Sequence, residues 1–250
     1  MKLNYKIILF MAFLLCTIHN IYSQRWKRTR YELHIAVGPT FFFGELGGAN
    51  KPGTHILSDL DLRATRYSID LGARYKIREK FALKLNFIYG RLHGSDAYTD
   101  YMPRRNRNAS FYSGYFEPSI YAEYSILKER LGVRYTLQNI RRFKLQYVNT
   151  YVFAGFGGIV FNPHTTNANI KTNKNENFSK INFVFPVGFG FRYGFNRRTT
   201  IGIEYGQRFT STDYLDGFSD IHSKARDSYA ILYFIFTYKL KTARSGLPKF

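Results

Sequence analysis

Residues 67–77 decide the fold, and they read Tyr-Ser-Ile-Asp-Leu-Gly-Ala-Arg-Tyr-Lys-Ile. Apolar and polar residues alternate along this stretch without a break. Neighbouring side chains of a β-strand point to opposite faces, so Ile69 and Leu71 would share one face while Asp70 and Arg74 share the other. The stretch therefore predicts a strand with one apolar face and one polar face.

The same alternation returns along the chain. It is clear at 81–90, 117–126, 181–194 and 201–208, and weaker at 31–43, 148–161 and 228–240. Many of these segments are about twice as long as the usual soluble strand of ~5–6 residues. They are long enough for the ~9–11 residues of a tilted transmembrane strand. Together they predict eight strands that cross a membrane.

The connections between these segments alternate in length. Residues 78–80 and 195–198 are tight, whereas long polar connections lie at 44–62, 93–112, 162–180 and 211–227. Short turns on one side and long loops on the other are typical of outer-membrane barrels. We therefore expect an all-β fold: an antiparallel transmembrane β-barrel of eight strands, with long extracellular loops and both termini on the periplasmic side.

One connection does not fit this rule. Residues 127–146 should form a short turn, yet they are long and rich in Lys and Arg, with Glu129 as their one acidic residue. One interpretation is an extra hairpin, which would give a ten-stranded barrel, or an elongated strand pair. The other is a basic periplasmic loop that binds a partner through Arg130, Arg134, Arg141 and Arg142.

The N-terminus has the pattern of a secretory signal. Lys2 and Lys6 precede an apolar run at 7–18, which is followed by small and polar residues. We expect a signal peptide over 1–23 and an outer-membrane barrel over 24–250. A signal anchor is the alternative, although the run is short for a membrane span. Cys16, the one cysteine, lies inside the apolar run, so the mature chain would have no thiol chemistry.

Composition narrows the class of protein further. Aromatic residues make up 18% of the chain, which excludes a disordered protein, and the formal net charge is +20. The basic residues are dispersed over strands and loops instead of gathered on one helix. We therefore expect lipid phosphates or acidic proteins as partners, and no nucleic acid.

Several charged residues fall on the polar faces of the expected strands. An eight-stranded barrel has an interior only just wide enough for its side chains, so charges there must pair. We predict a lumen charge network that plugs the barrel; a pore is the alternative. Its members are Arg66, Asp70, Arg74, Lys84, Glu117, Glu123, Arg192, Glu204 and Arg208.

Motifs for catalysis, metals and cofactors are lacking. The histidines at 34, 55, 93, 164 and 222 show no metal-ligand spacing, and there is no nucleophile elbow or P-loop. We expect no catalytic, metal or cofactor-binding residues. A hydrolase at the barrel rim is the remaining enzymatic alternative, and its candidate residues are Asp213, Asp216, Asp220 and His222.

The chain resembles a known family of outer-membrane barrels. The most specific segment is 203–217, Ile-Glu-Tyr-Gly-Gln-Arg-Phe-Thr-Ser-Thr-Asp-Tyr-Leu-Asp-Gly. Further similar segments are Tyr67–Tyr75, Phe81–Asp96, Tyr115–Pro118, Glu123–Tyr124 and Tyr151–Pro163. They are similar to the PorG-like proteins found with the type IX secretion system of Bacteroidetes.

This resemblance implies a non-enzymatic, structural or assembly component of a protein secretion system in the outer membrane of a Gram-negative bacterium. It also implies two partners, a periplasmic ring lipoprotein and its soluble partner. It brings no set of active-site residues. A small porin or a ligand-handling transport barrel remains the alternative function.

Overall fold

The computed structural model describes residues 25–44, 46, 63–98, 102, 106, 108–127, 148–166, 178–194, 198–218, 226–243, 245 and 247–249. The expected signal peptide over 1–23 lies outside these residues. So do the four arginines of the basic connection, Arg130, Arg134, Arg141 and Arg142.

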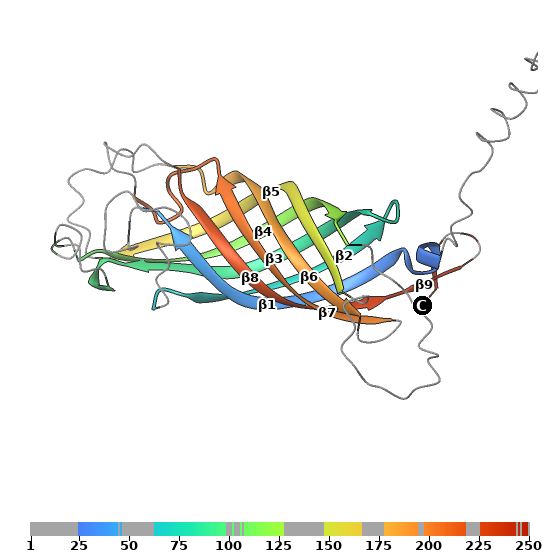
Figure 1. Ribbon diagram of the computed structural model, residues 1–250. Coiled ribbons are helices and arrows are strands. Elements are labelled where there is room, and N and C mark those ends of the chain that lie inside the picture. The colour runs from blue at the N-terminus through green and yellow to red at the C-terminus, as the bar shows by residue number, and fades with distance from the viewer. Residues whose placement is uncertain are drawn as a thin grey trace, which may run out of the picture.

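The chain folds into a closed antiparallel barrel of eight strands, in which each strand pairs with the next and β8 returns to β1 (Figure 1). The strands are β1 (Tyr31–Phe43), β2 (Arg66–Lys76), β3 (Phe81–Ser95), β4 (Ser110–Ser125), β5 (Val148–Thr166), β6 (Ile181–Gly194), β7 (Thr199–Thr210) and β8 (Ser228–Lys239). The predicted fold and strand number are confirmed, and the ten-stranded alternative is wrong. Two further short strands, β9 (Lys241–Thr242) and β10 (Pro248–Lys249), pair with each other outside the barrel.

Helical structure is minor. The short 3-10 segments η1 (Arg25–Thr29) and η3 (Asp96–Tyr98) flank strands. None of the described residues belongs to a helix long and apolar enough to cross a bilayer.

The barrel has two different ends. At the end we call the turn end, residues 77–80 join β2 to β3 and residues 195–198 join β6 to β7. Both termini of the barrel lie there as well. The Lys76 amide donates to the Arg30 carbonyl at 2.9 Å, and the Lys239 amide donates to the Arg198 carbonyl at 2.7 Å. The opposite end, which we call the loop end, is where β1, β3, β5 and β7 end and where β2, β4, β6 and β8 begin (Figure 1).

Exposure alternates along the strands as the sequence pattern predicts. In β3, Leu83, Leu85 and Phe87 are 42%, 40% and 45% exposed, whereas Lys84 and Asn86 between them are buried. The apolar side chains thus point outward and the polar ones inward. A water-soluble barrel would have the reverse arrangement.

The loop end is closed by apolar side chains. Leu92, Phe111 and Phe161 point into the barrel near this end and pack in one cluster with Leu215 and Phe218 of the β7–β8 connection. We call this cluster the apolar cap. Its connection is held in place by carboxylates, as described below.

Proline interrupts three of the strand ladders. The β1–β8 ladder skips Pro39, the β4–β5 ladder skips Pro118, and the β5–β6 ladder skips Pro186. Proline lacks the N–H that a ladder needs, so each interruption follows directly from the sequence.

Candidate functional site in the barrel lumen

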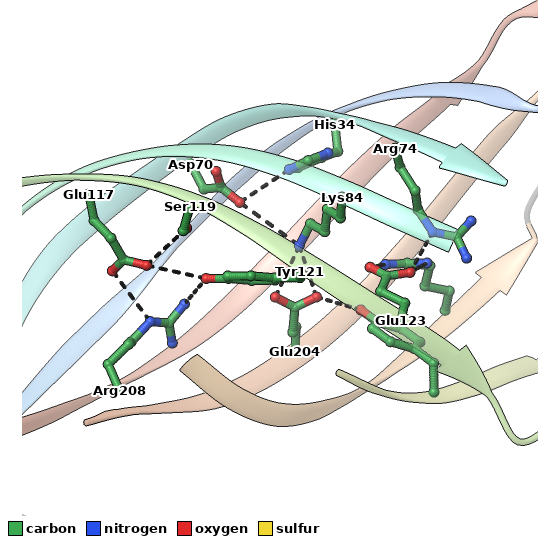
Figure 2. Close-up of polar contacts among 12 residues, drawn as sticks. His34, Asp70, Arg74, Lys84, Glu117, Ser119, Tyr121, Glu123, Glu204 and Arg208 are labelled. Carbon is green, nitrogen blue, oxygen red and sulfur yellow. Dashed lines mark hydrogen bonds and ion pairs between the residues drawn. The ribbon is translucent and has the colours of Figure 1, made fainter. Parts of the chain in front are cut away.

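The inward faces of the strands carry a network of charged side chains in three groups along the lumen. Figure 2 shows side chains from strands on opposite walls pointing toward one another. Strand alternation explains why they face inward, since every second residue of a strand points to the same side. The closed barrel then brings together residues that are far apart in the sequence.

The first group lies near the turn end and centres on Glu123 of β4. Arg74 of β2 donates from Nε to Glu123 Oε2 at 2.5 Å and from Nη1 to Glu32 Oε2 at 2.8 Å. Arg192 of β6 binds the same Glu123 carboxylate through both Nη atoms, at 3.0 and 2.7 Å. Lys76 Nζ lies 2.6 Å from Glu32 Oε1. These contacts join β1, β2, β4 and β6.

The second group lies in the middle of the lumen and centres on Lys84 of β3. Its Nζ donates to both carboxylate oxygens of Glu204 at 3.0 Å, and it lies 4.0 Å from Asp70 Oδ2. His34 Nε2 is 3.2 Å from the same Asp70 oxygen. The Tyr151 hydroxyl donates to Glu204 at 2.7 Å.

The third group lies next to the apolar cap and centres on Glu117 of β4. Arg208 Nε lies 3.6 Å from Glu117 Oε2, and the Tyr229 hydroxyl donates to the same oxygen at 2.5 Å. Ser119 donates to the other carboxylate oxygen at 3.0 Å. Arg208 also donates to the Tyr121 hydroxyl at 3.1 Å.

Aromatic rings fill the space between the three groups. The guanidinium of Arg192 lies 3.8 Å from the centre of the Tyr151 ring, and Lys84 Nζ lies 5.5 Å from the centre of the Tyr121 ring. Tyr121 stacks on Phe153 with ring centres 4.9 Å apart. Cations over aromatic faces are attracted by the ring quadrupole, so these rings also help to neutralise the buried charges.

Burial of the network is complete enough to close the lumen. Glu117 and Arg208 have no exposed surface, and Lys84 and Glu123 are 1% exposed. Buried charges are tolerated where each one is paired and hydrogen-bonded, as here. Where the three groups lie along the lumen, the described side chains occupy the space that a water-filled channel would need.

Inward-facing glycines make room for the larger side chains. A Cβ atom added at Gly72 would lie 2.0 Å from the Leu85 carbonyl oxygen of the next strand and 2.6 Å from Cε1 of His34, and one added at Gly90 would lie 2.8 Å from the Tyr115 hydroxyl oxygen. All three distances are too short for real contacts. The polar-face glycines of the sequence therefore provide space for lumen side chains.

The structure brings together all the charged residues predicted for the lumen except one. Asp70, Arg74, Lys84, Glu117, Glu123, Arg192, Glu204 and Arg208 lie in the three groups. Among the described residues, Arg66 makes no contact with these groups, so its assignment to the network is wrong. It lies at the loop-end start of β2, where its Nη1 donates to the backbone carbonyls of Arg63 and Thr65 at 3.3 and 2.9 Å.

Other members of the network were missed by the sequence analysis. Glu32 and His34 lie on β1, where polar and apolar residues do alternate over 31–37, and that signal could have identified them. Tyr229, Tyr233 and Lys239 lie on β8. Apolar residues occupy both faces of this strand, so its sequence does not show which face points inward. Tyr121 and Tyr151 are inward-facing residues whose polar atom is a single hydroxyl.

The acids proposed for a rim hydrolase have structural contacts where they are described. Asp216 is buried and accepts hydrogen bonds from the backbone amides of Leu46 at 3.2 Å and Phe218 at 3.0 Å. It thereby anchors the connection that forms the apolar cap. Asp213 lies in a surface pocket described below, and the other two candidates, Asp220 and His222, lie outside the described residues. The described residues contain no group of acids, histidines and cysteines suited to hold a metal ion.

Taken together, the fold and the lumen define a class of protein: an eight-stranded barrel that is apolar outside and closed inside by paired charges. The chain belongs to the family described as domain of unknown function DUF6089, whose model matches residues 6–235. No curated protein matches its sequence.

Solved structures of bacterial membrane barrels are similar to the chain at low identity. Neisserial surface protein A is 12% identical, with 84% of this chain and 96% of that chain covered and a TM-score of 0.46. Ail of Yersinia pestis, solved with the heparin analogue sucrose octasulfate, is 11% identical, with 84% and 99% covered and a TM-score of 0.39. OprG of Pseudomonas aeruginosa is 10% identical, with 86% and 98% covered and a TM-score of 0.39.

Proposed function

We propose that the protein is a non-enzymatic barrel of the bacterial outer membrane that serves as a structural or assembly component of a type IX-like secretion system. In this role it anchors a periplasmic ring lipoprotein and the soluble partner of that lipoprotein. The observation that carries the proposal is the combination of an apolar exterior with a lumen closed by buried ion pairs.

The exterior supports the placement in a membrane. Outward-facing Leu71, Phe185 and Phe236 are 53%, 52% and 47% exposed, and they come from strands on different sides of the barrel. A closed barrel has no free strand edge, which is the condition for spanning a bilayer with strands. The expected export signal and the strand length agree with the outer membrane as the location.

The closed lumen favours a scaffold over a porin. A transport barrel needs a path for its solute, whereas here the apolar cap and the three charged groups fill successive levels of the lumen. The small-porin alternative would require these buried, mutually paired side chains to separate. Separation would leave unpaired charges in a low-dielectric interior, which is very costly.

The basic connection supports a role in docking. It leaves β4 and enters β5 at the turn end, because the Ser125 amide donates to the Lys80 carbonyl of the tight turn at 2.8 Å. The termini of the barrel lie at the same end, which is the periplasmic one in a barrel of this topology. Its excess of arginine and lysine would attract an acidic partner surface, and such attraction weakens as salt screens the charges.

The proposal is tested by replacing Arg130, Arg134, Arg141 and Arg142 with Ser. We expect the barrel to fold and insert normally, while co-purification of ring components falls and secretion declines. The control replaces Arg104, Arg105 and Arg107, which precede β4 in the sequence, with Ser and should leave co-purification and secretion unchanged. Normal secretion together with retained ring components at raised salt would refute the docking role.

A conductance measurement separates the scaffold from the porin. Purified protein in a planar bilayer should give no stable open channel. A steady single-channel current in the unmodified protein would overturn the closed-lumen argument and favour transport.

A further inference from the structure

A surface pocket at the loop end lies apart from the lumen network. It has a volume of about 350 Å³ and opens to the outside. It is formed by the start of β6, by the residues that follow β7, and by Arg226 just before β8. Its volume lies within the range of about 300–1,000 Å³ that is usual for small-molecule sites.

One wall of the pocket is aromatic. Phe178 and Tyr214 line the pocket with nearly parallel rings whose centres are 4.9 Å apart, and Phe161 of the apolar cap stacks behind Phe178 with 6.3 Å between ring centres. Phe178 is the middle ring, so each of its faces is covered by a neighbour. Tyr214 is the last ring of the stack and lines the pocket, and we infer that a ligand would pack on its face turned away from Phe178.

The rest of the pocket carries small groups that donate and accept hydrogen bonds. The Ser211 hydroxyl oxygen accepts a bond from the Phe183 amide at 3.0 Å, which leaves its proton to be donated. The Thr212 hydroxyl oxygen accepts a bond from the Tyr214 amide at 3.2 Å, so its proton is also left to be donated. Asp213 and Arg226 add a carboxylate and a guanidinium to the same lining.

These groups are held in place before any ligand arrives. The Asn182 amide donates to the Ser179 carbonyl at 2.7 Å, which fixes the β6 side of the pocket. The Asp227 amide donates to the Thr212 carbonyl at 3.2 Å, and the Leu215 amide donates to the Asp227 carboxylate at 2.9 Å. A site that is ordered in advance loses less conformational entropy on binding.

The geometry points to a binding site for a pyranose ring of an extracellular carbohydrate. The apolar C–H face of a sugar ring packs on an aromatic face, and its ring of hydroxyls both donates and accepts hydrogen bonds, which matches hydroxyl, amide, carboxylate and guanidinium neighbours. A nucleotide fits less well, because the lining holds the carboxylate of Asp213 as well as Arg226, which offsets the positive charge that a phosphate requires.

The test measures saturation-transfer NMR on the protein refolded in a detergent without a sugar headgroup, with methyl glucoside, N-acetylglucosamine and glucuronic acid as probes. We expect transfer to the ring C–H protons of at least one probe. Tyr214→Ala should weaken binding by about tenfold or more. Tyr214→Phe keeps the ring and should bind within about threefold of the unchanged protein.

A matched control comes from another exposed aromatic residue at the loop end. Tyr112 stacks on His164 with ring centres 4.9 Å apart and does not line this pocket. Tyr112→Ala should therefore leave sugar binding unchanged. All variants are first checked for the compact, heat-sensitive gel migration of a folded barrel, so that loss of binding is not loss of folding.

Two further arms identify the source of the sugar. One compares vesicles with and without lipopolysaccharide, and the other uses soluble oligosaccharides that carry no lipid. Binding in the first arm alone assigns the pocket to the carbohydrate of the outer leaflet, and binding in the second assigns it to external glycans. No transfer to any sugar, equal binding by Tyr214→Ala, or transfer to AMP instead would each overturn the proposal.

Discussion

Arg192 and Glu123 form a two-point ion pair that reaches across β5, with both Nη atoms of the arginine on β6 bound to the two carboxylate oxygens of the glutamate on β4. The same carboxylate accepts a bond from Arg74 of β2. A single side chain of β4 therefore holds guanidinium groups that come from both sides of the barrel.

Removing this carboxylate should destabilise the barrel strongly. Glu123→Ala leaves the guanidinium groups of Arg74 and Arg192 buried without their shared partner. Breaking a buried pair in this way costs about 3–5 kcal/mol. Urea unfolding in lipid vesicles measures the loss. The exposed Glu79 of the β2–β3 turn is the control position, and Glu79→Ala should change the unfolding free energy little. Equal effects at the two sites would show that the lumen pair is not structural.

Outward-facing leucines should not tolerate charge. Leu85 is 40% exposed on the apolar exterior of β3, and Leu85→Arg near the bilayer midplane should cost about 2–4 kcal/mol in lipid. Leu71, Ile120 and Val187 face outward in the same way and should respond similarly. The free energy of unfolding in vesicles is the measurement. Unchanged stability of Leu85→Arg would mean that this face does not contact lipid.

Two glycines offer a test of close packing against the barrel wall. A Cβ added at Gly72 would lie 2.0 Å from the backbone carbonyl oxygen of Leu85 and 2.6 Å from the His34 ring, whereas one added at Gly114 would have nothing within 4 Å. Gly72→Ala should therefore destabilise the barrel by about 1–3 kcal/mol. Gly114→Ala should be neutral or stabilise it by up to about 1 kcal/mol, because alanine restricts the unfolded chain. The opposite order of unfolding midpoints would contradict the inward placement of Gly72.

Substitution of two buried asparagines should change the free energy of unfolding by different amounts. Neither polar atom of the Asn86 amide has a hydrogen-bond partner among the described residues, although the side chain is fully buried. Asn86→Leu should leave stability unchanged or raise it. Asn149 Nδ2 donates to the Leu127 carbonyl at 2.6 Å, so Asn149→Leu should cost about 1–3 kcal/mol. A large loss at Asn86 would indicate that ordered water or another partner satisfies its amide.

The sequence was most informative where one face of a strand is polar. In β2 and β6 the alternation of residue types predicted both the strand and the direction of its side chains, including Asp70 and Arg192. In β8 it could not, since Tyr233 and Phe234 point to opposite sides although both are aromatic. An alternating pattern shows which way the side chains point only where one face of the strand is polar and the other is apolar.

The partners within the lumen were beyond the sequence pattern. Alternation places Glu117 and Arg208 on the same side of the barrel wall, but which charges meet depends on the stagger between strands and on the width of the closed barrel. Arg66 shows that inward parity alone does not place a residue in the lumen network. It has the inward parity of its strand, yet it lies so close to the loop end that backbone carbonyls are its acceptors.

The contact between Lys84 and Glu204 joins residues 120 positions apart, on β3 and β7. Reversing one of these charges alone would place two like charges side by side without water, whereas reversing both restores the attraction. In the history of the family, the two positions should therefore change together. Lipid-facing positions such as Leu85 need only stay apolar, so they are free to change one at a time.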